Sequence, residues 1–331
     1  MGPKNPLNHA RPIEVLASLT ATRPAPHVML VRSGGLGDTI LLLPALQILR
    51  RQLPGVRLTL VGSEWAEALR PLIPFPLTLV RFDAPALAPL FGSLVETDSS
   101  GLFARTDAIV LYTADASSHF AQNATRHCAG PVRTWPIAPA QGTHAAVHFA
   151  QAIAQGAINP DDLPAPRLRP PSGLLPWARG WLDARLGPLS RPVAIHPGSG
   201  GRRKCWPARR FATLAARLDR PVLLLEGPAD AEPCREFAAQ LPLSLRTAHA
   251  AGLPIPQAAA LLCECRLYVG SDSGVSHLAA ALGVPTMAVF GPTDPAVWQP
   301  LGDRVALARA MAGAAWPAPD EVALVARRLC A

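Results

Sequence analysis

The chain has 331 residues, of which 49% are hydrophobic and 16% are charged, and its formal net charge is +8. This length allows two domains of ordinary size, and the composition is that of a folded globular protein, which excludes a disordered chain. The positive charge favours anionic partners, but only 5% of the residues are aromatic and no basic run alternates with aromatic residues, which argues against nucleic acid as a partner.

The first 26 residues predict an N-terminal extension (1–26) that precedes the folded part. They contain a short apolar patch but not the continuous apolar segment of a signal peptide. No apolar run in the sequence reaches the roughly 18 residues that span a bilayer. The six cysteines form no CxxC pair, so we expect free thiols in a reducing compartment and no zinc site. We therefore expect a cytoplasmic protein, whose positive charge is compatible with peripheral contact at the inner membrane surface.

Strand and helix patterns alternate through the first half of the chain. The first clear strand is 27–32 (HVMLVR), and its apolar middle is typical of a buried parallel strand. A helix from Asp38 to about Leu53 follows, with a kink predicted at Pro44. The pattern continues with strands at 57–61, 77–80 and 108–112 and with helices at 64–69 and 145–155.

A stretch rich in proline, aspartate and arginine (159–176) interrupts this alternation, and we place a linker at 166–176. The alternation then resumes, with strands at 193–196, 222–225, 267–270 and 286–290 and helices at 209–218, 231–241, 257–263, 275–282 and 321–329. This order predicts an α/β fold of two facing doubly wound, Rossmann-like domains over 27–165 and 177–331. Ligands of such sheets bind beyond the carboxyl ends of the strands, so the loops that follow the strands are the candidate sites.

The glycine loop (32–38, RSGGLGD) follows the first strand. Gly34, Gly35 and Gly37 let the backbone turn sharply and approach a ligand. Asp38 falls at the start of the next helix, where an aspartate either caps the helix or is free for chemistry. The loop lacks the Gly-Lys-Ser/Thr of a P-loop, and Ile40 stands where a dinucleotide fingerprint needs glycine or alanine, so neither motif fits.

The cationic loop (196–207, HPGSGGRRKCWP) follows the strand at 193–196. Ser199, Gly200 and Gly201 precede three consecutive cations, and backbone amides with a hydroxyl and positive charge make an anion cradle. Lys204 stands out because the only other lysine is Lys4, whereas the remaining 29 of the 31 basic residues (31 − 2) are arginines. A solvated basic turn is the alternative.

The Asp-Ser-Gly loop (270–277, GSDSGVSH) joins the strand at 267–270 to the next helix. Free amides at the helix start, together with Ser273 and Gly274, predict a phosphate site. The loop resembles the nucleophile elbow of hydrolases, but its central residue is Asp272 rather than serine, which excludes that motif. His277, one turn into the helix, either contacts the same anion or is structural.

Taken in order, these loops resemble glycosyltransferase family 9, the heptosyltransferases. The matching segments are VRSGGLGDTILLLPAL (31–46), HPGSGGRRKCWPARRFATLA (196–215), LLLEGPADAE (223–232) and VGSDSGVSHLAAALGVPTMAVFGPTDP (269–295). The resemblance covers roughly residues 27–300. Residues 81–165, where the family binds its acceptor, match only in pattern.

The resemblance implies a GT-B fold with the acceptor on the N-terminal domain and the nucleotide sugar on the C-terminal domain. It also implies inverting transfer, without a metal or cofactor, from ADP-heptose or a similar nucleotide sugar onto a lipopolysaccharide-type or related anionic glycan acceptor. By the resemblance, Asp38 is the catalytic base and Lys204 binds the phosphates and stabilises the leaving group. The remaining residues that it assigns to the donor are Asp272, Ser273, Gly274 and His277, with Glu232 as a ribose contact.

Two alternatives stay open from the sequence. A GT-B enzyme that uses another nucleotide sugar, or epimerises one, would share these loops. A nucleotide-sugar-binding module without turnover would share them too, if Asp38 served only as a helix cap.

Overall fold

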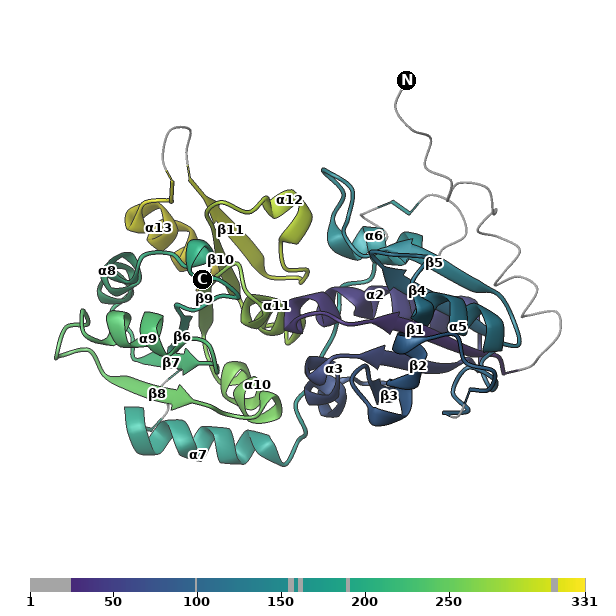
Figure 1. Cartoon of the computed structure of the whole chain (residues 1–331). Coiled ribbons are helices and arrows are strands. Elements are labelled where there is room, and N and C mark those ends of the chain that lie inside the picture. The colour runs from purple at the N-terminus through teal and green to yellow at the C-terminus, as the bar shows by residue number, and fades with distance from the viewer. Residues whose placement is uncertain are drawn as a thin grey trace, which may run out of the picture.

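The computed structural model describes residues 25–98, 100–153, 158–159, 163–188, 191–310 and 315–330. They form two lobes, each built on one parallel sheet with helices on its faces (Figure 1). The predicted N-terminal extension lies outside the described residues as far as position 24. The division into domains at 27–165 and 177–331, with a linker at 166–176, stays a prediction.

The first lobe contains a five-stranded sheet in the order β3-β2-β1-β4-β5, and all its strand pairs are parallel. Its strands are β1 (His27–Arg32), β2 (Arg57–Gly62), β3 (Thr78–Arg81), β4 (Ala108–Thr113) and β5 (Val132–Pro136). Its helices are α2 (Leu36–Gln52), α3 (Glu64–Leu69), α4 (Pro89–Gly92), α5 (His119–His127) and α6 (Ala145–Gln151), with short 3-10 turns at Arg70–Leu72 and Pro85–Leu87.

The second lobe contains a six-stranded parallel sheet in the order β11-β10-β9-β6-β7-β8. Its strands are β6 (Val193–His196), β7 (Val222–Glu226), β8 (Thr247–Ala251), β9 (Leu267–Ser271), β10 (Thr286–Phe290) and β11 (Val305–Arg309). Its helices are α7 (Leu174–Leu186), α8 (Ala208–Leu218), α9 (Ala231–Ala238), α10 (Ile255–Cys263), α11 (Gly274–Ala281), α12 (Pro295–Trp298) and α13 (Pro319–Cys330). The strand order reverses between β6 and β9, which is where doubly wound sheets bind ligands.

The central strands form because their apolar side chains are buried on both faces. Val28, Met29 and Leu30 of β1 are each 0% exposed, as expected of parallel strands covered by helices. The predicted strands at 27–32, 193–196 and 286–290 are confirmed to the residue. The first predicted helix begins earlier than expected, at Leu36, and continues through Pro44.

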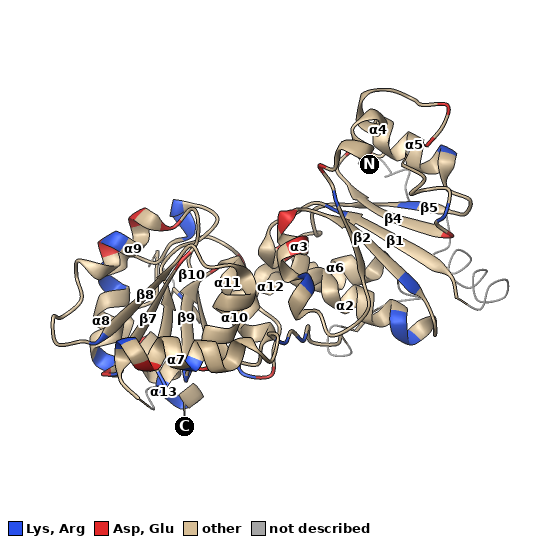
Figure 2. Ribbon diagram, turned by 90° about the horizontal axis from the view of Figure 1, so that it is seen from below, with Lys and Arg blue, Asp and Glu red and all other residues tan. Residues whose placement is uncertain are grey.

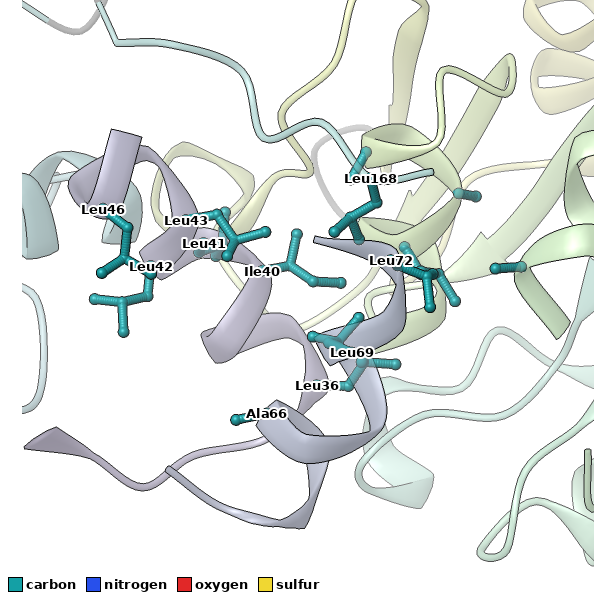
Figure 3. Close-up of a cluster of buried hydrophobic side chains, with 14 of the residues drawn as sticks. Leu36, Ile40, Leu41, Leu42, Leu43, Leu46, Ala66, Leu69, Leu72 and Leu168 are labelled. Carbon is teal, nitrogen blue, oxygen red and sulfur yellow. The ribbon is translucent and has the colours of Figure 1, made fainter. Parts of the chain in front are cut away.

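The two lobes share one buried apolar cluster, which extends from α2 and α3 of the first lobe into α11 of the second. Figure 3 shows the first-lobe side of this cluster, where Leu36 lies beside Leu69 at the start of α2. The predicted linker is also held by both lobes, because Leu168 N–H donates to Ala281 O at 2.9 Å and Arg169 N–H to Leu72 O at 2.9 Å. The start of α2 is therefore buried against the second lobe.

Charged residues are scattered over both lobes rather than gathered into one stripe (Figure 2). All six cysteines are free thiols, as predicted. Among the described residues, none of the helices has the length and apolar character that a membrane crossing requires.

Candidate active site

A cavity of about 640 Å³ lies between the lobes, within the usual size of a small-molecule site. Its walls include the ends of β6 and β7 and the loop after β9, all at the carboxyl edge of the second sheet. The first lobe contributes residues 35–38 of the glycine loop and Trp65 of α3, whereas Gly34 does not line the cavity. The cavity thus unites the three loops that the sequence predicted as candidate sites.

In the glycine loop, Asp38 is the third residue of α2 and not the cap itself. The N-cap is Gly35, whose N–H donates to Asp38 Oδ2 at 3.0 Å. Gly34 makes this geometry accessible, since a Cβ there would lie 2.8 Å from Cβ of Asp38. Asp38 therefore caps the helix from inside its first turn, and its carboxylate remains on the cavity wall.

A buried arginine holds the Asp38 carboxylate from the other side. Arg32 Nη2 donates to Asp38 Oδ1 at 2.7 Å, and Arg32 is only 7% exposed. The guanidinium also lies over the ring of Phe149, 4.5 Å from its centroid. Both oxygens of Asp38 thus have one fixed donor each and keep a lone pair for a further hydrogen, which is the geometry that a general base needs.

The cationic loop brings Lys204 to the Asp-Ser-Gly loop. Lys204 Nζ lies 3.1 Å from Asp272 Oδ2, and the Ser199 hydroxyl donates to Asp272 O at 2.5 Å. Trp206 fixes the end of the loop, because its N–H donates to Ser271 Oγ at 2.9 Å and its buried indole donates to Pro317 O at 3.2 Å. The two loops are thereby joined at the carboxyl ends of neighbouring strands β6 and β9.

In the Asp-Ser-Gly loop the polar side chains are nearly all buried. Asp272, Ser273 and His277 are 6%, 7% and 4% exposed, and all three line the cavity. Burial lowers the pKa of His277 from its ordinary value of 6.5 to about 4, so the ring is neutral at pH 7. Its Nδ1 is buried and has no hydrogen-bond partner among the described residues, so one hydrogen-bonding position of the ring is unused in this structure.

Glycines set how closely the two lobes approach at the cavity. A Cβ on Gly274 would lie 2.7 Å from Leu36 Cβ and 3.0 Å from Gly37 N, and a Cβ on Gly37 would lie 2.9 Å from Cδ2 of His277. The first turn of α11 therefore touches the first turn of α2. Gly274 serves a contact between lobes, in addition to any approach of a ligand.

Two predicted donor residues do not reach the cavity. The Glu232 side chain is 63% exposed and lies 3.5 Å from Arg202, which also pairs with Glu236 at 2.9 Å. Neither Glu232 nor Gly201 lines the cavity, whereas Ser199, Gly200 and Lys204 do.

Sequence reasoning missed several residues of the cavity wall. Glu226, the last residue of β7, accepts from His249 Nε2 at 2.8 Å, and its place at a strand end was the signal that could have found it. His196 and Asp230 form a buried pair at 2.8 Å. The apolar part of the wall includes Leu36, Trp65, Leu225, Ala250, Leu253, Ile255, Val275, Leu278 and Trp298. An apolar wall with a few polar groups is typical of a small-molecule site.

Comparison with known proteins gives a consistent result. The sequence model of "Glycosyltransferase family 9 (heptosyltransferase)" matches residues 107–321. Lipopolysaccharide heptosyltransferase 1 of Pseudomonas aeruginosa is 28% identical over 299 residues, which cover 81% of this chain and 79% of that protein.

Solved structures show the same architecture. A family 9 glycosyltransferase from Veillonella parvula superposes with a TM-score of 0.75 at 20% identity, covering 92% of this chain and 97% of the other. ADP-heptose lipopolysaccharide heptosyltransferase II of Escherichia coli superposes with a TM-score of 0.73 at 18% identity, covering 92% and 98%. The predicted GT-B arrangement of two facing Rossmann-like lobes is confirmed.

Proposed function

Because this chain belongs to glycosyltransferase family 9, we propose that it transfers heptose from ADP-heptose onto a lipopolysaccharide-type or related anionic glycan acceptor. The observation that carries the proposal is the shared cavity, in which Asp38 of one lobe faces a wall that contains Lys204, Asp272, Ser273 and Gly274 of the other. The names of the P. aeruginosa and E. coli relatives support the donor and the acceptor class.

The proposed reaction is a single displacement that inverts the anomeric carbon. The acceptor oxygen attacks that carbon while its hydroxyl proton moves to the Asp38 carboxylate. The bond from the anomeric carbon to the phosphate oxygen breaks, and its electron pair leaves with ADP. The carboxylate held by Arg32 and by the Gly35 amide accepts the proton without having to reorient.

The charge that grows on the leaving diphosphate needs positive partners, which stabilise the transition state more than the ground state. Lys204 supplies a cation, and Gly274 and Val275, the first two residues of α11, line the cavity. A helix start of this kind favours anions. This set supports transfer without a metal. The contact between the lobes limits the access of water, which would otherwise compete with the acceptor.

We place the reaction at the cytoplasmic face of the inner membrane, where a lipid-linked anionic acceptor would meet a protein of net charge +8. The test is incubation with ADP-heptose and a lipopolysaccharide core acceptor that lacks heptose. We expect ADP release that depends on the acceptor, and a product heavier by one heptose.

GDP- and UDP-sugars serve as alternative donors in the same assay. Transfer from one of these would move the assignment to another nucleotide sugar. A changed nucleotide sugar without nucleotide release would indicate an epimerase, and binding without turnover would indicate a binding module.

A further inference from the structure

Three polar side chains from separate segments form a continuous chain in the second-lobe wall of the cavity. His196 Nε2 lies 2.8 Å from Asp230 Oδ2, and His196 Nδ1 lies 3.3 Å from Ser273 Oγ. The three residues are 7% (Asp230), 2% (His196) and 7% (Ser273) exposed. Such a buried polar chain is costly unless its hydrogens are well placed, and the leaving-group chemistry proposed above does not use two of its three members.

The Asp230 carboxylate is held in place from several sides. Gly227 N–H donates to Oδ2 at 3.0 Å, and Gly198 passes so close that a Cβ there would overlap the carboxylate. Burial raises the pKa of Asp230, but the hydrogen bond and charge of His196 outweigh this effect and leave the pKa below its ordinary value. Asp230 is therefore an ionised acceptor that faces one nitrogen of His196.

Ser273 is the N-cap of α11, yet its hydroxyl makes no capping bond to an amide of that helix. A serine at this position usually does so. Here the Oγ lies near His196 Nδ1 and, at 3.5 Å, near Ser276 Oγ. His196 Nδ1 is the nearer of these two partners, at 3.3 Å, so the protonation of the His196 ring acts directly on the direction of the Ser273 hydrogen.

The direction of this hydrogen depends on the proton count of His196. A carboxylate only accepts, so Nε2 must donate to Asp230. In the neutral ring Nδ1 then accepts the Ser273 hydrogen, and the serine offers only lone pairs to the cavity. In the protonated ring Nδ1–H donates to Ser273 Oγ, and the hydroxyl hydrogen is free to bond a phosphate oxygen.

We propose that His196 and Asp230 are positioning residues that aim the Ser273 hydroxyl at the diphosphate, and that His196 takes up one solvent proton when the diphosphate binds. This inference rests on the proposed function, since it assumes a nucleoside diphosphate in the cavity. The imidazolium is stabilised by Asp230 on one side and by the phosphate charge on the other.

Other ionisable groups share this cavity wall and act on the same proton. Asp38, Glu226 and Asp272 favour the imidazolium by their charge, whereas Lys204 opposes it and His277 is neutral. Tyr268 contacts Ser276 behind Ser273, at 3.1 Å. None of these groups bridges His196 and Ser273 directly among the described contacts, so the proton on Nδ1 remains the element that sets the serine.

The test is calorimetric titration of ADP at pH 7.5 in two buffers that differ in ionisation enthalpy. We expect the wild-type protein to take up about one proton per ADP. If the wild-type protein took up no proton on binding ADP, this result alone would overturn the inference.

Variants locate the proton. His196→Gln keeps reach toward Asp230 but loses the contact with Ser273, and we expect the uptake to vanish and ADP affinity to fall roughly 10-fold. Ser273→Ala should weaken ADP similarly, and the double variant should be no weaker than either single one. His196→Asn, which keeps a polar atom near the Nδ1 position, should restore part of the affinity. The control is His27→Gln, which removes a histidine hydrogen bond to Thr59 at the amino end of β1, away from the carboxyl ends of the strands where the cavity lies.

The outcomes separate the two proposals. A wild-type protein that binds ADP while His196→Gln binds it equally well would overturn only the positioning role. Additive losses in the double variant would do the same. A wild-type protein that binds none of ADP, GDP and UDP would overturn the proposed function and this inference with it.

Discussion

The ammonium of Lys204 lies 3.1 Å from the carboxylate of Asp272, and this pair joins the loop after β6 to the loop after β9. The lysine side chain is 41% exposed whereas that of Asp272 is 6% exposed, so the aspartate is the fixed member. The contact is an ion pair without hydrogen-bond alignment, because Asp272 Oδ2 has no hydrogen-bond partner among the described residues. Lys204 is thus held at the cavity and can still turn toward a phosphate.

Removing this cation tests the leaving-group role. We expect Lys204→Ala to weaken ADP binding roughly 10- to 100-fold, because a charged hydrogen bond contributes about 1.5–3 kcal/mol. The loss in kcat should be steeper if the charge acts mainly in the transition state. Arg203→Ala removes an equal charge from an exposed neighbour outside the cavity wall and should bind ADP as the wild type does. Equal affinity in Lys204→Ala would remove the leaving-group role. Calorimetric titration measures the ADP affinity, and kinetics with the nucleotide-sugar donor measure kcat.

Asp38→Asn tests the general base. We expect turnover to fall by about 10²-fold or more with ADP-heptose affinity nearly unchanged, since asparagine cannot take the proton. Asparagine keeps an acceptor oxygen for Arg32 or Gly35, so the helix start should persist. The control is Asp115→Asn, which changes an exposed carboxylate whose contacts among the described residues are with Ser117 of the same loop. Transfer at the wild-type rate would reduce Asp38 to a cap.

Gly274→Ala tests the contact between the lobes. The added Cβ would lie 2.7 Å from Leu36 Cβ and 3.0 Å from Gly37 N, and overpacking of this kind costs about 1–3 kcal/mol. We expect a lower melting temperature and weaker ADP binding. Gly180→Ala, in α7 with open space around its Cβ, should be neutral or stabilising. A Gly274→Ala protein as stable as the wild type would contradict the contact.

Acid should destabilise the protein through its buried histidines. The pKa of His277 is about 4 when folded and 6.5 ordinarily, so between these values the unfolded chain binds more protons. The contribution of His277 to the free energy of unfolding is therefore fully present above pH 6.5 and is lost as the pH falls toward 4. Burial lowers the pKa of His144 and His148 in the same direction. Urea unfolding at pH 7 and 5 should show this loss, and His277→Gln should lessen it. If the free energy of unfolding fell as much between pH 7 and pH 5 in His277→Gln as in the wild type, His277 would not be the source of the loss.

The proposed leaving-group set predicts activity without a divalent metal. We expect transfer in EDTA to equal that in untreated enzyme, because Lys204 and the α11 amides take the role that Mg²⁺ has elsewhere. Loss of activity in EDTA that Mg²⁺ or Mn²⁺ restores would refute this. A known metal-dependent glycosyltransferase in the same buffer controls for chelation.

The sequence predicted central strands better than edge strands, for a physical reason. A strand buried on both faces is a continuous apolar run, as in β1 and β10. The edge strand β8 alternates exposed and buried residues over only five positions, and β5 contains Arg133 and Pro136. These patterns do not differ enough from a loop to be recognised.

Helix α7 was missed because its first turn falls inside the predicted linker. Its sequence LLPWARGWLDARL contains Pro176 and Gly180, which usually interrupt helices. Pro176 is tolerated because it stands in the first turn, where no helical hydrogen bond is lost. The helix is stabilised by packing on α10 and β8, which local sequence does not report.

The candidate site was predictable where its residues follow strands directly. Asp38, Lys204 and the Asp-Ser-Gly loop were found this way. The His196–Asp230 pair was not, because 34 positions separate its members and only the sheet brings them together. Glu232 was chosen from the same segment as Glu226, but the first turn of α9 carries it toward Arg202 instead.

The contact of Gly37 with Gly274 also limits how the lobes can rotate. Rotation about this contact would leave the carboxylate of Asp38 and the first turn of α11 almost stationary, whereas the distant edges of the two sheets would move farthest. Substrate could then enter and product leave by rotation about this pivot, without altering the spacing between proton acceptor and diphosphate. The axis of such a rotation would pass through Gly37 and Gly274, which have no side chains to keep the two backbones apart.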